Sequence, residues 1–328
     1  DFGGYIVKDR VWLYGSYIPN LHRSERTVNF TYPGKVGARS FLYTSSTHYA
    51  SGRLDWRPMD SIRTNFSWNY AYNRTRGERP GQDSLYGQYN AASTVDPTSY
   101  RQEVGTINPN ANYVISTDFT ISPKLIVTAR FGLFDTNSSD RGRPEGIRYS
   151  YTTSAIGGTA LDGTPIPTAL QQPSGWQNMG GNRQTIFDTR KRHYLGTDAS
   201  YLVRGAGHHN FKAGYAFNRL RNNVDLSYNR ALVNIQWGVD YVPNLATGAT
   251  VCAQLKAQNK TKYGKEVCSG LYGVYNVSDY AVAGNVSSFN HSLYVQDAWS
   301  VARGVSLNLG VRFDKEYLPS FSTGKNVA

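Results

Sequence analysis

The chain has 328 residues, a formal net charge of +12 and a hydrophobic fraction of 39%, with a mean hydropathy of −0.51. No stretch of it approaches the roughly 18 consecutive apolar residues of a transmembrane helix. Tyrosine, phenylalanine and tryptophan make up 13% of the residues, and glycine contributes 32. This composition, together with a period of two that is stronger than the helical period, predicts an all-β protein.

Five tight turns predict five β-hairpins. Each turn is rich in Gly, Pro, Asp or Ser and separates two alternating segments. The turns lie at 7–10, 57–61, 122–124, 204–207 and 302–304. After the second turn, Ile62, Phe66 and Tyr70 alternate with polar residues such as Arg63 and Asn65. The first hairpin is less regular, because both of its faces carry large residues.

The last hairpin has the clearest alternation. In residues 304–314, GVSLNLGVRFD, five apolar residues alternate with Ser, Asn, Gly, Arg and Asp. Before and after the third turn, Ile115 and Phe119, then Val127 and Phe131, alternate in the same way. Such strands require an apolar medium on one face and a polar one on the other.

Tight turns alternate with long polar connections at about 20–47, 75–109, 137–187 and 221–288, the order that is typical of outer-membrane barrels. From Ile62 to Tyr72, a rise of ~3.3 Å per residue and a tilt of about 40° span roughly 25 Å, the height of the apolar band of such barrels. We therefore predict a transmembrane antiparallel up-and-down β-barrel with about ten strands. Its apolar face would contact lipid and its polar face would line the interior.

Aromatic residues are expected at the two membrane interfaces, where a ring can lie in the apolar zone while its polar tip stays hydrated. Three tryptophans lie near tight turns, and three further aromatic residues lie at the far end of one strand. The set is Trp12, Trp56, Trp299, Trp68, Tyr70 and Tyr72. The alternative is that these rings pack between two sheets of a soluble sandwich.

The predicted interior face has a basic excess. Its basic residues are Arg53, Arg57, Arg63, Arg130, Lys212 and Arg312, and its acidic residues are Asp55, Asp118, Asp198 and Asp314. Either these charges form a salt-bridge network against a plug or loop, or they make a wall that attracts anionic solutes. Further basic clusters at 74–79, 141–148 and 190–193 either contact lipid phosphate or are simply solvated. No nucleic-acid-binding motif accompanies the basic charge.

Cys252 and Cys268 lie in one polar segment and are predicted to form a loop-closing disulfide, which implies an oxidising compartment. Two free thiols are the alternative. The six histidines are scattered, and no catalytic motif is found, so we expect no catalytic residues, no metal site and no cofactor. The chain is not expected to be an enzyme.

Two stretches resemble hairpins of Oar-like TonB-dependent outer-membrane receptors. They are FGGYIVKDRVWLYGSY (2–17) and SLYVQDAWSVARGVSLNLGVRFD (292–314), and GRLDWRP (52–58) also fits. The resemblance implies a 22-stranded barrel with an N-terminal plug, of which 1–328 would be a partial barrel domain. The plug, the N-terminal domain and the C-terminal strands would be absent from these residues.

The resemblance also implies a function in the bacterial outer membrane. Long extracellular loops would bind a scarce large solute, and a TonB-type energy-transducing complex, reached through the N-terminal part, would drive import through the polar lumen. The tight turns would face the periplasm and the Cys252–Cys268 loop the outside. Lipid, lipopolysaccharide and other outer-membrane proteins are expected partners.

Two rival interpretations remain at this stage. One is a structural, adhesive or passive-pore barrel without active transport, including a complete small barrel closed by pairing its first and last strands. The other is a secreted soluble β-sandwich or propeller that binds carbohydrate.

Overall fold

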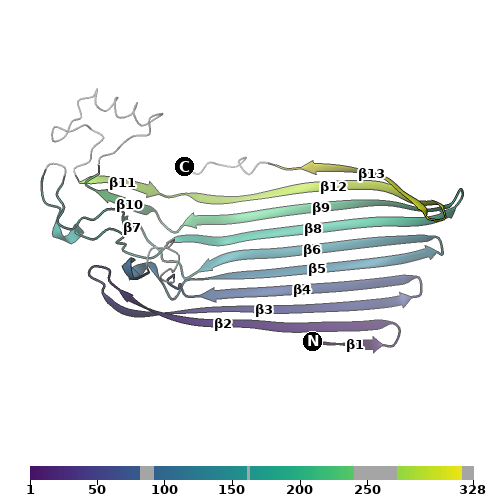
Figure 1. Cartoon of the computed structure of the whole chain (residues 1–328), viewed down its shortest axis with the longest axis horizontal. Helices are drawn as coiled ribbons and strands as arrows, with labels where there is room; N and C mark the ends of the chain where they lie inside the picture. The colour runs from purple at the N-terminus through teal and green to yellow at the C-terminus, as the bar shows by residue number, and fades with distance from the viewer. Residues whose placement is uncertain (82–91, 161–162, 240–271, 320–328) are drawn as a thin grey trace, which may run out of the picture.

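The computed structural model describes residues 1–81, 92–160, 163–239 and 272–319. Ten antiparallel strands form one sheet in the order β1-β2-β3-β4-β5-β6-β8-β9-β12-β13 (Figure 1). Their bounds are β1 Phe2–Val7, β2 Val11–Phe30, β3 Gly37–Met59, β4 Ile62–Arg76, β5 Gly105–Ser122, β6 Leu125–Arg141, β8 Arg183–Arg204, β9 His208–Tyr228, β12 Ala281–Ala302 and β13 Val305–Tyr317.

All five predicted hairpins are present, and their tight turns lie together at one end of the sheet (Figure 1). The turns contain residues in the left-handed region, such as Gly207 with φ of 115° and Gly304 with φ of 83°. Glycine adopts these angles without the steric cost that a side chain would bring. The prediction of an all-β antiparallel fold is confirmed.

The strands extend further from the tight turns than the alternation predicted. β2 runs to Phe30 and β3 begins at Gly37, so most of the expected 20–47 connection is strand. β9 likewise continues to Tyr228. In these extensions the alternation does not continue in phase, because the later apolar residues lie on the opposite face from Phe217 in β9 and from Leu21 in β2. These residues are Leu220, Val224 and Leu226 of β9 and Val28 and Phe30 of β2. The backbones still pair residue by residue.

Among the described residues, no protein layer covers the face of the sheet that carries Leu54, Phe66, Ile115, Phe131 and Leu195, which we call the apolar face. Leu195 is 50% exposed, and Leu309 of the last strand is 58% exposed. An apolar surface of this extent is unfavourable in water and suits contact with hydrocarbon. The soluble sandwich is therefore contradicted, because its second sheet would have to cover these side chains.

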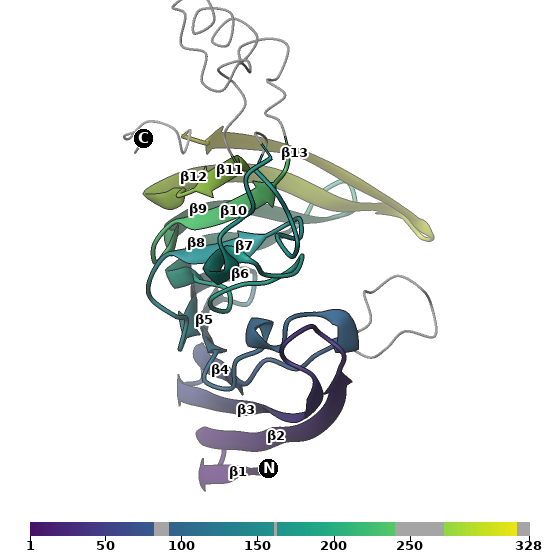
Figure 2. The same ribbon diagram turned by 90° about the vertical axis from the view of Figure 1, so that its left-hand side faces the viewer.

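The sheet curves from β1 at one edge to β13 at the other (Figure 2). No described residue of β1 pairs with β13, so the ten strands do not close on themselves. The rival of a complete ten-stranded barrel is contradicted, since closure would require that pairing. No helix among the described residues is long and apolar enough to cross a membrane.

Shorter elements gather at the long-connection end of the sheet. β7 (Arg148–Tyr151), β10 (Leu232–Trp237) and β11 (Gly273–Ser278) form a separate three-stranded sheet. Three 3₁₀ turns, η1 (Ala92–Thr94), η2 (Pro97–Ser99) and η3 (Thr168–Leu170), lie in the same connections. These segments were predicted as long polar connections, and no periodic pattern in them indicated the small sheet.

Candidate functional site

The strand register places the predicted interior charges on one side of the sheet. Arg63 pairs with Asp118 across β4 and β5, and Asp118 pairs with Thr128 across β5 and β6. Side chains of directly opposed residues share a face, so this relation extends from strand to strand. We call this side, which carries Arg53, Arg63, Arg130, Lys212 and Arg312, the polar face.

Asp198 is the most buried charge in this group. Its side chain is 8% exposed and bridges two strands, with its oxygens 2.5 Å from Arg130 Nη1 and 3.3 Å from Lys212 Nζ. Arg130 comes from β6, Asp198 from β8 and Lys212 from β9. One carboxylate thus pairs with two cations across three strands, which favours the salt-bridge interpretation of the basic excess.

Two similar pairs form within single strands, because residues two apart on a strand share a face. Arg53 Nε lies 2.8 Å from Asp55, and Arg312 Nε lies 2.8 Å from Asp314. Arg57 pairs with Asp60 of the tight turn at 3.3 Å. Ion pairs thus line the polar face from its first strands to its last.

Five of the six predicted interface aromatics share the apolar face: Trp56, Trp68, Tyr70, Tyr72 and Trp299. Trp299 donates its indole N–H to the carbonyl of Ala206 in a tight turn at 2.9 Å. Trp12 differs, because the register pairs it with Asp55 on the polar face. The alternation of the first hairpin is weak, so the sequence alone assigned Trp12 to the wrong side.

The long connections fold over the polar face at one end of the sheet. Val28, Phe30 and Phe41 project from the polar side of β2 and β3 and form a buried cluster against Tyr100 of the β4–β5 connection. Arg79 lies over the ring of Tyr43, also on the polar side, 5.4 Å from its centroid. We call the described residues 28–41, 92–103, 146–160, 163–182, 231–237 and 272–278 the loop platform.

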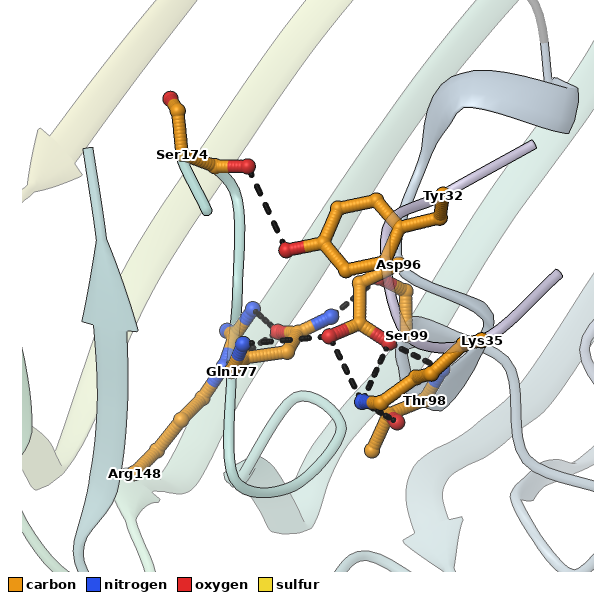
Figure 3. Close-up of polar contacts among 8 residues, drawn as sticks. All are labelled: Tyr32, Lys35, Asp96, Thr98, Ser99, Arg148, Ser174 and Gln177. Atoms are coloured by element: carbon orange, nitrogen blue, oxygen red, sulfur yellow. Dashed lines mark hydrogen bonds and ion pairs between the residues drawn. The ribbon is translucent and has the colours of Figure 1, made fainter. Parts of the chain in front are cut away.

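Asp96 holds the loop platform together (Figure 3). Its carboxylate is fully buried, and each of its two oxygens accepts a hydrogen bond from Lys35 Nζ at 2.8 Å. It also accepts from the backbone amide of Thr98 at 2.9 Å and from that of Gln177 at 3.3 Å. Three connections that are distant in the sequence therefore meet at one charge-assisted centre.

Gln177 and Tyr32 extend this centre (Figure 3). Arg148 Nε donates to the Gln177 side-chain oxygen at 3.1 Å, and Gln177 Nε2 donates to Ser99. Tyr32 donates its hydroxyl to the carbonyl of Ser174 at 3.3 Å. Burial, and then the nearby Asp96 carboxylate, raise the pKa of Tyr32, so its phenol is neutral at physiological pH.

The small sheet of the loop platform carries an apolar hollow. A cavity of about 590 Å³ is lined by Tyr149, Ile235, Trp237, Tyr272 and Tyr275, among others. Three of these lining residues, Ile235, Trp237 and Tyr272, also pack against a second buried cluster, formed by Tyr151, Ala155 and Ile166. Aromatic walls that stand on a packed core can hold the apolar part of a large solute without rearrangement.

Within the described ranges no group of three or more His, Asp or Glu side chains is placed to hold a metal ion. The predicted Cys252–Cys268 disulfide lies outside the described residues. The residues of the Asp96 centre were not predicted from the sequence. The sequence Asp96-Pro97-Thr98-Ser99 is a typical turn signal, but its partners at 35 and 177 have no local signature.

Residues 36–327 match the sequence profile of a family described as outer membrane beta barrel domain. The chain belongs to this family. The barrel domain is therefore a protein of the bacterial outer membrane, and its apolar face is its lipid side. This agrees with the uncovered face described above.

The resemblance to Oar-like receptors is also confirmed. The barrel domain is 24% identical over 365 residues to the TonB-dependent transporter Oar of Myxococcus xanthus, which covers 96% of this chain and 33% of Oar. It also shares a fold with the outer membrane transporter YddB of Escherichia coli, with 13% identity and a TM-score of 0.57 over 96% of this chain and 33% of YddB. The barrel domain thus spans about a third of each protein. Both are named as transporters, and neither as an enzyme.

Proposed function

We propose that the barrel domain is the wall and surface-loop part of a receptor that captures a scarce large solute and imports it with energy from a TonB-type complex. The observation that carries this proposal is the loop platform, which the buried Asp96 centre fixes over the polar face. A rigid, aromatic surface at the mouth of an ion-paired wall suits capture followed by passage inward. A plug and the contact with the energy-transducing complex would lie elsewhere in the protein.

The proposed orientation has the loop platform outside the cell and the tight turns in the periplasm. A cysteine in place of Ala169, an exposed residue of η3, should react with a membrane-impermeant maleimide on intact cells. A cysteine in place of Lys8, exposed in the first tight turn, should react only after the cells are permeabilised. The reverse pattern would overturn the orientation.

Import itself is testable without knowing the solute. Spent media from the wild-type strain and from a strain that lacks the full-length gene would be compared by mass spectrometry. We expect at least one large solute to remain outside the mutant cells. It should be taken up again when the full-length gene is restored, but not when the energy-transducing complex is also deleted.

The structural or adhesive alternative predicts a different result in the same strains. Solute depletion would be unchanged by deletion of the gene, while cell-surface attachment or the assembly of other outer-membrane proteins would be impaired. That outcome would contradict import.

A further inference from the structure

We infer that the lipid side of the barrel domain carries a binding site for the phosphate groups of lipopolysaccharide, formed by Arg23 of β2 and Arg74 and Arg76 of β4. This inference rests on the proposed orientation, since lipopolysaccharide occupies the leaflet that faces outward. It adds a specific site to a partner that was expected only in general terms.

The register brings these arginines together on the apolar face. Arg23 pairs with Thr44, and Thr44 pairs with Arg76, so two guanidinium groups flank one hydroxyl across three strands. The next row toward the tight turns contains Leu21, Ser46 and Arg74. Together these rows line a groove of about 480 Å³.

The arginines are exposed and have no acidic partner among the described residues. Arg23, Arg74 and Arg76 are all exposed, whereas the basic residues of the polar face pair mainly with carboxylates. Glu25 lies two residues beyond Arg23 on the same side, but no ion pair joins it to these arginines in the described part of the chain. The groove is therefore a cationic site ready to accept an anion, and guanidinium groups bind phosphate with strong, directed hydrogen bonds.

The height of the site matches the lipid headgroups. From Ile62 at the tight turn to Arg74, the strand rises about 40 Å at ~3.3 Å per residue. A tilt of about 40° reduces this to roughly 30 Å, just past an apolar band about 25 Å tall. Directly below the arginines, the rows that contain Tyr72 and Tyr70 lie at the expected interface level.

A second part of the outer rim also carries arginines on the apolar face. Arg219 and Arg221 of β9 lie on the apolar face at a similar distance from their tight turn. Arg219 lies over the Phe289 ring at 5.6 Å, and Arg221 donates to Asn285 at 3.1 Å. Neither has a carboxylate partner among the described residues. Arginine without an acidic partner therefore recurs at this level of the outer rim, as expected if the rim faces a layer of phosphates.

The test uses the full-length protein, extracted from outer membranes in mild detergent. The variant Arg23→Gln/Arg74→Gln/Arg76→Gln should retain about tenfold less lipopolysaccharide than the wild type, the loss expected for one charge-assisted hydrogen bond or more. The control Lys8→Gln/Lys124→Gln/Arg303→Gln removes the same charge at the tight-turn end and should retain wild-type amounts. Heat-modifiable migration on gels would show that each variant is folded.

Three further binding measurements identify the ligand. Nanodiscs that contain lipid A should bind the wild type more tightly than nanodiscs with dephosphorylated lipid A, and excess inorganic phosphate should not displace the lipid. Equal retention by wild type and triple variant, or full displacement by inorganic phosphate, would overturn the inference. Binding is measured without transport, so failure of the import experiment would leave this result unaffected. Failure of lipopolysaccharide binding would likewise leave the import proposal unaffected.

Discussion

Replacement of Asp198 with asparagine is expected to lower the free energy of unfolding of the full-length barrel by about 1–3 kcal/mol. Loss of one partner from a fully buried ion pair costs about 3–5 kcal/mol. The Asp198 side chain is 8% exposed, but Arg130 and Lys212 are 40% and 35% exposed, so water offsets part of the loss. Urea unfolding in lipid vesicles, followed by tryptophan fluorescence, measures the change.

Two matched variants isolate the cause. Asp60→Asn removes a carboxylate that is 86% exposed and 3.3 Å from Arg57, so it should change stability by less than about 0.5 kcal/mol. Adding Arg130→Gln and Lys212→Gln to Asp198→Asn removes the uncompensated cations and should recover part of the loss. If Asp198→Asn were as stable as the wild type, the bridge would not contribute to the barrel wall.

The hairpins could be predicted from the sequence because each one carries its own local pattern, an alternation of apolar and polar residues next to a turn signal. In 304–314 and in the strands around the third turn, alternation and a turn signal lie within about twenty residues, and both follow directly from the chemistry of a two-sided strand. The first hairpin lacks clean alternation, and there the assignment of Trp12 failed. The extensions of β2 and β9 were missed because their apolar residues, such as Val28 and Leu220, change face along the strand, so the alternation does not continue in phase from the spanning segment.

The face on which the charges lie could be predicted from the sequence, but the partner of each charge could not. Alternation alone assigned Arg130, Lys212 and Asp198 to one face, but only the register shows that Asp198 lies between the two cations. The loop platform could not be predicted from the sequence, because its centre joins residues 35, 96 and 177, which are far apart in the chain. A contact of this kind depends on the path of the whole chain, which no local pattern encodes.

Replacement of Asp96 with alanine is expected to release the loop platform while leaving the barrel folded. The carboxylate is fully buried and accepts from Lys35 and from the backbone amides of Thr98 and Gln177. Its removal leaves two backbone amide donors without their acceptor and the partly exposed Lys35 ammonium without its counter-ion, although Thr98 Oγ1 still accepts from Lys35, so the local cost is about 2–4 kcal/mol. Hydrogen exchange by mass spectrometry should show faster exchange in residues 93–100 and 172–178, with strand protection unchanged.

The same variant tests whether a fixed platform is required for capture. Asp96→Asn keeps the acceptor oxygen but removes the charge, so its loops should exchange at an intermediate rate. Glu103→Gln is the control, because its pair with Arg101 is partly exposed and joins residues only two apart in the chain. If the solute that accumulates outside the deletion strain is still depleted at the wild-type rate by Asp96→Ala cells, the platform does not need to be rigid. Capture would then depend on other parts of the protein.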